Sequence, residues 1–322
     1  MSIRAGALLF LAVAASFIAS LLLPWSVMAE LIATEPDLAA AILVELRFPR
    51  AALALIYGAT LGASGAAVQA LFANPLASPD LTGTTSGAAL GAVVTAYLFG
   101  FSAPIALSVG AVAGALAALS LLLMLAGPRA ETATLLLAGL AISALAGALT
   151  TLALALAPSP FAFYDAYDWL MGSLVDRSLA QTAFAAVPAL FTILLLLRLA
   201  RPLDSLALGE EVAQSLGHDV FRLRLHIVCL TALGVGACVA ICGAIGFVGL
   251  VAPIFARHLT RGHPGRAILP AAAIGAILLI AADLAARSAP LGRTLPIGVV
   301  TALIGAPFFL WLVAHMRWKL VK

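Results

Sequence analysis

The stretch PIALSVGAVAGALAALSLLLMLA, residues 104–126, contains no charged side chain. An apolar helix of about 20 residues is long enough to cross the hydrocarbon core of a bilayer. Comparable stretches lie along the whole chain, at residues 5–27, 50–72, 83–100, 134–157, 180–200, 225–243, 246–261, 267–287 and 295–315. The sequence therefore predicts an all-α polytopic membrane protein, with about ten transmembrane helices in a single transmembrane domain over residues 1–322.

The overall composition supports the same class. Of the 322 residues, 64% are hydrophobic and 10% are charged, whereas roughly a quarter of the residues in a soluble domain are charged. A membrane β-barrel would show short segments of alternating polarity, and these long Ala- and Leu-rich stretches do not alternate. The net charge of +3 comes from basic residues scattered between the spans, so we expect the lipid bilayer as partner and no nucleic acid.

The distribution of basic residues predicts the orientation of the chain. With the N-terminus in the cytoplasm, twelve of the 17 Lys and Arg residues lie in cytoplasmic segments, as the positive-inside rule requires. We therefore expect a multi-pass protein of the cell inner (cytoplasmic) membrane with both termini in the cytoplasm. Residues 5–27 are too long for the apolar region of a signal peptide, which favours a retained first span.

Glycine and serine recur at helical spacing inside two spans. They place small faces on two helices, and such faces allow close helix packing in lipid. The residues are Gly58, Gly62 and Gly65 in the second span, and Gly139, Ser143 and Gly147 in the fifth.

Three other segments are irregular. Residues 73–87 combine two prolines, an asparagine and a Thr/Ser/Gly run, which fits either a capped turn or a gate, because irregular backbone at membrane depth must be surrounded by protein or a water-filled cavity. Residues 201–218 form the largest cytoplasmic segment and predict short amphipathic helices broken at Gly209 and Gly217. Residues 243–258 predict a close-packed, kinked helix.

Together these segments resemble the FecCD-type permeases, the membrane subunits of bacterial ATP-binding-cassette (ABC) importers for ferric siderophores, haem and cobalamin. The resemblance extends from about Arg47 to Trp311. The motifs that carry it are RFPR at 47–50, NPLASPDLTGTTSGAALG at 74–91, LLLAG at 135–139, LALGEEVAQSLG at 206–217, GAIGFVGLVAP at 243–253, AADLAAR at 281–287 and LPIGVVTALIGAPFFLWL at 295–312. It implies the type II ABC importer permease fold.

The resemblance also implies the partners of the chain. It predicts a homodimer that works with two ABC ATPase subunits and a periplasmic or lipid-anchored substrate-binding protein. The chain has no Walker A motif, so we expect no catalytic residue, metal or cofactor in it, with ATP and magnesium bound by the ATPase. In the family the segment matching residues 201–218 carries the coupling helices, here with Asp204, Leu206, Leu208, Gly209, Glu210, Leu216 and Gly217.

Two further groups of residues gain a role from the resemblance. It implies that Arg47, Arg50 and Arg287 lie outside and receive acidic residues of the binding protein, since each guanidinium can bind a carboxylate with two hydrogen bonds. It implies that cytoplasmic gates lie at Asn74, Leu76, Thr132 and Thr134. One departure is visible, because Arg293 and Thr294 stand where the family usually has a glutamate before LPIG.

For the cargo, the resemblance implies a ferric siderophore first, with cobalamin and haem as alternatives. An ion-coupled secondary transporter is a more distant alternative, since it requires ionisable residues inside the spans and the predicted spans carry almost none. An enzyme is disfavoured, because the sequence contains neither an HExxH nor a GxSxG motif.

Overall fold

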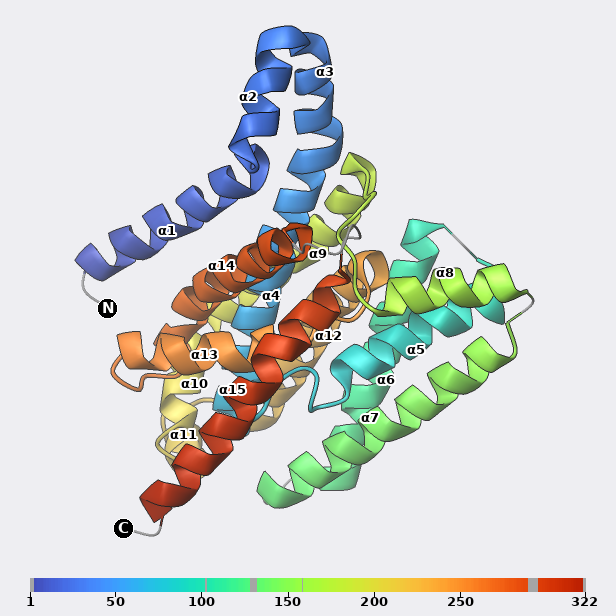
Figure 1. Cartoon of the computed structure of the whole chain (residues 1–322). Coiled ribbons are helices and arrows are strands. Elements are labelled where there is room, and N and C mark those ends of the chain that lie inside the picture. The colour runs from blue at the N-terminus through green and yellow to red at the C-terminus, as the bar shows by residue number, and fades with distance from the viewer. Residues whose placement is uncertain (1–2, 102, 128–131, 158, 289–294, 321–322) are drawn as a thin grey trace.

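The computed structural model describes residues 3–101, 103–127, 132–157, 159–288 and 295–320, and the regular structure in these ranges is entirely helical (Figure 1). The α-helices are α1 (Ile3–Leu22), α2 (Trp25–Thr34), α3 (Pro36–Ala41), α4 (Phe48–Leu71), α5 (Thr84–Tyr97), α6 (Pro104–Ala126), α7 (Thr132–Ala155), α8 (Pro160–Leu170), α9 (Leu179–Arg198), α10 (Ala200–Leu206), α11 (Glu210–Ser215), α12 (Val220–Cys242), α13 (Val248–Leu259), α14 (Ile268–Arg287) and α15 (Ile297–Leu320). A π-helix, η1 (Ile42–Arg47), precedes α4, and a 3₁₀ turn, η2 (Gly265–Ala267), precedes α14.

The long helices correspond to the predicted spans. Seven helices of the described chain are long and apolar enough to cross a membrane, and each coincides with a predicted span: α1, α4, α6, α7, α9, α12 and α14. By contrast, α5 and α13 have only 14 and 12 residues. They measure about 21 and 18 Å, less than the ~30 Å hydrocarbon core. Each therefore needs an adjoining loop to complete a crossing, and that loop must be surrounded by protein.

Among the described helices, α4 and α14 share the most extensive contact. A Cβ atom on Gly62 would lie 2.0 Å from the carbonyl oxygen of Ala271, and one on Gly58 would lie 2.4 Å from that of Gly275. Gly65 approaches the backbone of α13 in the same way. The small face predicted on α4 is confirmed, and it brings backbones together where any side chain would separate them.

The corresponding face on α7 has a different use. A Cβ on Gly139 would lie 2.2 Å from the carbonyl oxygen of Leu81, and Ser143 Oγ donates to the carbonyl oxygen of Asp80 at 3.2 Å. Gly147 faces open space. Two of the three residues of this small face therefore pack against the irregular segment that precedes α5, and the face does not pack along a whole helix.

Two helical segments lie largely outside the predicted spans, and the first of them shares only residues 25–27 with the predicted span 5–27. Helices α2 and α3 form a hairpin that projects away from the bundle (Figure 1). Helix α8 is a separate short helix, which begins at a Ser159 cap whose side chain accepts from the backbone N–H of Ala162. Both segments contain Asp or Glu among their apolar residues, which is why no span was predicted there.

Irregular backbone from three distant parts of the chain meets in the interior. The N–H of Ile297 donates to the carbonyl oxygen of Gly172 at 3.0 Å, and the N–H of Ser173 donates to that of Cys242 at 2.8 Å. The loops after α8 and α12 and the start of α15 are thus joined by main-chain hydrogen bonds. Such bonds satisfy polar groups that lipid could not.

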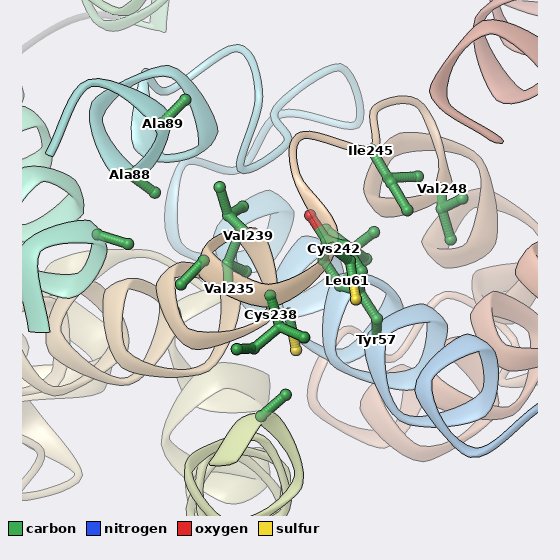
Figure 2. Packing of buried hydrophobic residues seen from close by; sticks show 14 of the residues in the cluster. Tyr57, Leu61, Ala88, Ala89, Val235, Cys238, Val239, Cys242, Ile245 and Val248 are labelled. Atoms are coloured by element: carbon green, nitrogen blue, oxygen red, sulfur yellow. The ribbon is translucent and has the colours of Figure 1, made fainter. Parts of the chain in front are cut away.

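Gly243 is the point of closest approach in this junction. Its φ of +73° lies in the left-handed region, and a Cβ there would lie 1.9 Å from the carbonyl oxygen of Trp169. Its own carbonyl oxygen accepts from the hydroxyl of Tyr57, on α4, at 3.2 Å. Figure 2 shows Tyr57 lying beside Cys242 and Ile245 in the apolar core. Helix α4 therefore holds this junction in place, in addition to packing against α14.

Candidate functional site

The segment after α9 forms the two short helices that the sequence predicts. Helix α10 ends before Gly209 and α11 ends before Gly217. These glycines have φ values of +111° and +85°, a backbone region that residues with a Cβ rarely adopt. The predicted breaks at both glycines are confirmed.

The apolar residues of this segment point in two directions. Leu203, Leu206 and Ala213 are buried in one cluster with Leu71 at the end of α4. Leu208 is 68% exposed. Leu216, also on the exposed side, is 59% exposed. The buried residues hold the segment against the bundle. The exposed residues form an apolar surface on the outer side of residues 200–217, which we call the coupling surface.

Polar contacts fix the same segment in place. Asp204 Oδ1 accepts from the backbone N–H of Gly265 at 2.8 Å, and Glu210 forms an ion pair with Arg224 on α12. A Cβ on Gly265 would lie 1.8 Å from the carbonyl oxygen of Ala200. Asp204 and Glu210 therefore position the coupling surface relative to the bundle, a role that the sequence alone did not separate from docking.

Arg50 and Arg287 meet at a buried carboxylate at the opposite end of α4. Asp283 is 1% exposed and lies 233 residues from Arg50 in the sequence. Arg50 Nε donates to its Oδ1 at 2.9 Å, and Arg287 Nε donates to its Oδ2 at 2.9 Å. Arg287 also donates to the carbonyl oxygen of Ser20, on α1, at 3.0 Å. Two of the three arginines thus share one internal carboxylate, which holds α1, α4 and α14 together.

Arg47 has no carboxylate partner among the described residues. Its Nη1 donates to the carbonyl oxygens of Leu21 at 2.8 Å and Leu23 at 3.1 Å. These groups lie at the C-terminal end of α1, where the helix dipole favours a cation. Arg47 is therefore oriented by neutral acceptors, and its charge is not cancelled by an ion pair.

A cavity of about 280 Å³ opens between these groups. The guanidinium-bearing residues that line it are Arg47, Arg50, Arg177 and Arg287, and we call it the arginine pocket. Arg177 precedes α9, and no motif predicted a role for it. Its only signal was a position directly before Ser178, the N-cap of that helix.

The loop between α4 and α5 is a defined structure. Asn74 is buried, and its Oδ1 accepts from the N–H of Leu76 at 2.9 Å, the pattern of an Asx turn. Leu76 is half-buried. Asn74 therefore forms a capped turn, the first of the two structures predicted for residues 73–87. The turn is also compatible with the second prediction, a gate.

Asp80 connects the same loop to the junction after α12. Its Oδ1 accepts from Thr85 Oγ1 at 2.6 Å, and its Oδ2 accepts from the N–H of Phe247 at 3.1 Å. Phe247 has a φ of +66°, an unfavourable conformation for an aromatic residue. A cavity of about 220 Å³ lies beside this contact, lined in part by Phe309. Asp80 was not singled out in the sequence, because the residue it binds lies 167 positions away.

The remaining predicted gate residues lie at the start of α7. Thr134 has an exposed side chain in the first turn. The side chain of Thr132 lies outside the described part of the chain, as do Arg293 and Thr294. Helix α7 approaches the loop between α4 and α5 through Gly139 and Ser143, further along the helix.

Comparison with known families matches residues 7–315 to the FecCD transport family. The chain belongs to this family. The match covers both the arginine pocket and the coupling surface, and it confirms the resemblance inferred from the motifs. This FecCD chain is thus a membrane transport subunit with the ABC importer permease fold.

Named relatives have related transport roles. Over 282 residues the chain is 41% identical to the vitamin B12 import system permease protein BtuC of Vibrio cholerae serotype O1, a match covering 84% of this chain and 82% of that protein. Over 273 residues it is 38% identical to the Fe(3+)-citrate import system permease protein YfmE of Bacillus subtilis strain 168, covering 84% and 81%.

A solved structure of a metal-chelate type ABC transporter, in an inward-facing conformation, supports the fold. It superimposes on this FecCD chain with a TM-score of 0.82 at 31% sequence identity, and the match covers 95% of this chain and 97% of that one. The predicted all-α importer permease fold is confirmed.

Proposed function

We propose that this chain is the permease subunit of an ABC importer that moves a metal chelate or corrinoid across the cytoplasmic membrane. The observation that supports it is that one long helix connects a charged pocket at one end to an apolar surface at the other. Helix α4 has 24 residues and extends from the arginine pocket to the buried cluster under the coupling surface. This length is about 36 Å, enough to place the two surfaces on opposite sides of a bilayer.

The coupling surface is assigned to the cytoplasm and to the ATPase. The exposed Leu208 and Leu216 offer apolar area that a groove of a soluble partner can bury. The missing Walker A motif means that nucleotide hydrolysis comes from that partner, which holds ATP and magnesium. A homodimer of the permease would bind two ATPase subunits and enclose the pathway at its axis.

The arginine pocket is assigned to the outside and to a substrate-binding protein. Arg47 offers an uncancelled charge there, whereas Arg50 and Arg287 share Asp283. On this proposal Arg47 faces the partner, and Arg50 and Arg287 also hold the helices together through Asp283. Because two guanidinium groups neutralise Asp283, this buried carboxylate is better suited to structure than to the proton coupling of a secondary transporter.

The loop around Asn74 and the first turn of α7 are assigned to the cytoplasmic gate. A gate must change its exposure during alternating access. Asn74, Leu76, Thr132 and Thr134 can close a pathway without burying a charge. The Asp80–Phe247 contact would transmit movement of this loop to the start of α13.

The cargo is assigned by class. Relatives that import vitamin B12 and Fe(3+)-citrate support a large metal complex, and a ferric siderophore is proposed first. Uptake of ⁵⁵Fe-siderophore, ⁵⁵Fe-citrate, ⁵⁵Fe-haem and ⁵⁷Co-cobalamin in a deletion strain, with and without the chain, would test it. We expect one complex to depend on the chain. Unchanged uptake of all four would contradict the assigned class.

A further inference from the structure

The arginine pocket carries more positive charge than its own carboxylates can balance. Among the described residues, four guanidinium groups line it together with the carboxylate of Asp176, and the buried carboxylate of Asp283 lies behind them. Two positive charges are therefore left over. Like charges this close together repel, so an anion that enters the pocket would be attracted to it.

Arg47 and Arg177 supply this excess. Arg50 and Arg287 are held by Asp283, whereas Arg47 donates only to main-chain carbonyl oxygens. Arg177 Nε is buried and has no hydrogen-bond partner within the described part of the chain. A buried donor that remains unpaired loses its hydration without compensation, so a ligand that accepts from Arg177 would recover this loss.

The position of Arg177 is fixed by its neighbours. On one side, Val175 donates its N–H to Ser173 Oγ at 3.1 Å. On the other side, Ser178 and Gln181 form a complete capping box at the start of α9. A side chain that leaves a fixed backbone toward a cavity is preorganised for binding, which lowers the entropy lost when a ligand is bound.

A structural role at the end of α12 is the competing explanation for Arg177, which lies close enough to Cys242 to interact electrostatically. Two carbonyl oxygens at that helix end already have donors. That of Cys242 accepts from the N–H of Ser173, and that of Gly243 accepts from Tyr57. These two oxygens therefore do not depend on Arg177 for a hydrogen bond.

The size of the pocket indicates what enters. Its volume of about 280 Å³ lies below the 300–1,000 Å³ typical of sites for whole small molecules. A single Asp or Glu side chain fits, and its carboxylate can accept two parallel hydrogen bonds from a guanidinium. A metal chelate or corrinoid is too large.

We propose that Arg177 is a fourth docking residue, which together with Arg47 receives an acidic side chain of the substrate-binding protein, while Asp283 holds Arg50 and Arg287 as the fixed wall of the pocket. This inference rests on the docking role proposed above. It adds a residue from a different segment, before α9, to the arginines of α4 and α14, and it makes the α8–α9 loop part of the docking surface.

The test is the affinity of the purified cognate binding protein for the permease–ATPase complex in nanodiscs, measured by surface plasmon resonance. Arg177→Ala should weaken binding roughly tenfold, the loss expected for a charge-assisted hydrogen-bonded pair, and should flatten its salt dependence. Arg177→Lys keeps the charge but not the two-pronged donor, so it should weaken binding by a smaller factor. Arg222→Ala, at an exposed arginine that pairs with Asp219, is the matched control and should bind like the wild type.

Each other outcome has a definite meaning. If Arg47→Glu weakens binding but Arg177→Ala and Arg177→Lys do not, docking stands and the role of Arg177 is wrong. If none of the three changes affinity, the docking proposal fails as well. Unfolding of both Arg177 variants at a lower temperature, with binding-protein affinity unchanged, would show a purely structural arginine. We expect acetate to compete with the binding protein no better than chloride does at equal ionic strength. Strong competition by acetate, with no effect of the Arg177 variants on affinity, would instead indicate a site for free anions.

Discussion

The two ends of α4 present opposite chemistry. At the coupling surface, Leu208 and Leu216 are exposed and form an apolar patch. Beneath it, Leu203 and Leu206 are buried in an apolar cluster of the bundle. At the arginine pocket, charged groups surround a cavity and are only partly paired. Apolar contact is insensitive to salt and suits a partner that stays bound and transmits force. Charged contact is screened by salt and speeds association, which suits a partner that arrives and leaves.

The packing of α4 against α14 joins these two ends, so breaking it should have the largest effect. Gly62→Val would place a side chain where even a Cβ would lie 2.0 Å from the carbonyl oxygen of Ala271. We expect a loss of about 3 kcal/mol or more in the free energy of unfolding, because backbone atoms cannot move aside as a flexible side chain can. Gly147→Val, at a position that faces open space, is the control. The yield and thermal unfolding of the two variants in detergent would be compared. Equal behaviour of Gly62→Val and Gly147→Val would refute the proposed role of the packing between α4 and α14.

The next largest effect should come from the apolar patch. Leu208→Asp combined with Leu216→Asp should abolish binding-protein-stimulated ATP hydrolysis while the permease stays folded, because each change would bury an unpaired charge in the partner at a cost of several kcal/mol. Leu206 is unsuitable for this test, since it packs against the bundle. Leu208→Met keeps the apolar surface and should remain active. Normal ATPase stimulation in the double variant would remove the coupling role.

A moderate effect is expected at the other end. Arg47→Glu should lower the affinity for the binding protein about tenfold, chiefly through slower association, and the difference should shrink as salt rises. Arg47→Gln can still donate to the carbonyl oxygens at the end of α1, so it separates lost charge from lost structure. Kinetics in 50 and 500 mM salt would measure this, and an identical loss at both concentrations would exclude an electrostatic role.

The smallest effect should concern the attachment of the coupling surface. Asp204→Ala removes the acceptor for the N–H of Gly265, a contact worth about 1 kcal/mol at a partly exposed site. We expect the ATPase to remain bound, but with fewer cargo molecules moved per ATP hydrolysed. Asp204→Asn keeps an acceptor and should restore most of this ratio. An unchanged ratio in Asp204→Ala would show that the contact does not transmit movement.

Several features were predictable because they depend on local sequence. Glycines spaced by four and three residues mark the close face of α4, and Gly209 and Gly217 mark the ends of the coupling helices. The family motifs also grouped Arg47, Arg50 and Arg287, which the structure brings to one pocket. In each case neighbours in the chain carry the signal, because helical periodicity and left-handed turns are local properties.

The missed features depend on contacts between distant segments. No local pattern reveals that Asp283 binds Arg50, 233 residues away, or that Arg177 turns toward the same pocket. Helix α13 begins two residues later than the predicted span 246–261, where the N–H of Phe247 is bound by Asp80 from another loop. Hydropathy detects apolar length, but it does not show where a loop enters the interior.

On the proposed function, a separate ATPase subunit on the cytoplasmic side drives transport through this chain. Proteoliposomes containing the chain and its ATPase, with ATP enclosed and the loaded binding protein outside, test it most directly. We expect accumulation of labelled complex that requires both ATP and the binding protein and is lost in the Leu208→Asp, Leu216→Asp variant. Accumulation by the chain alone, driven by a proton or sodium gradient without ATP, would contradict it.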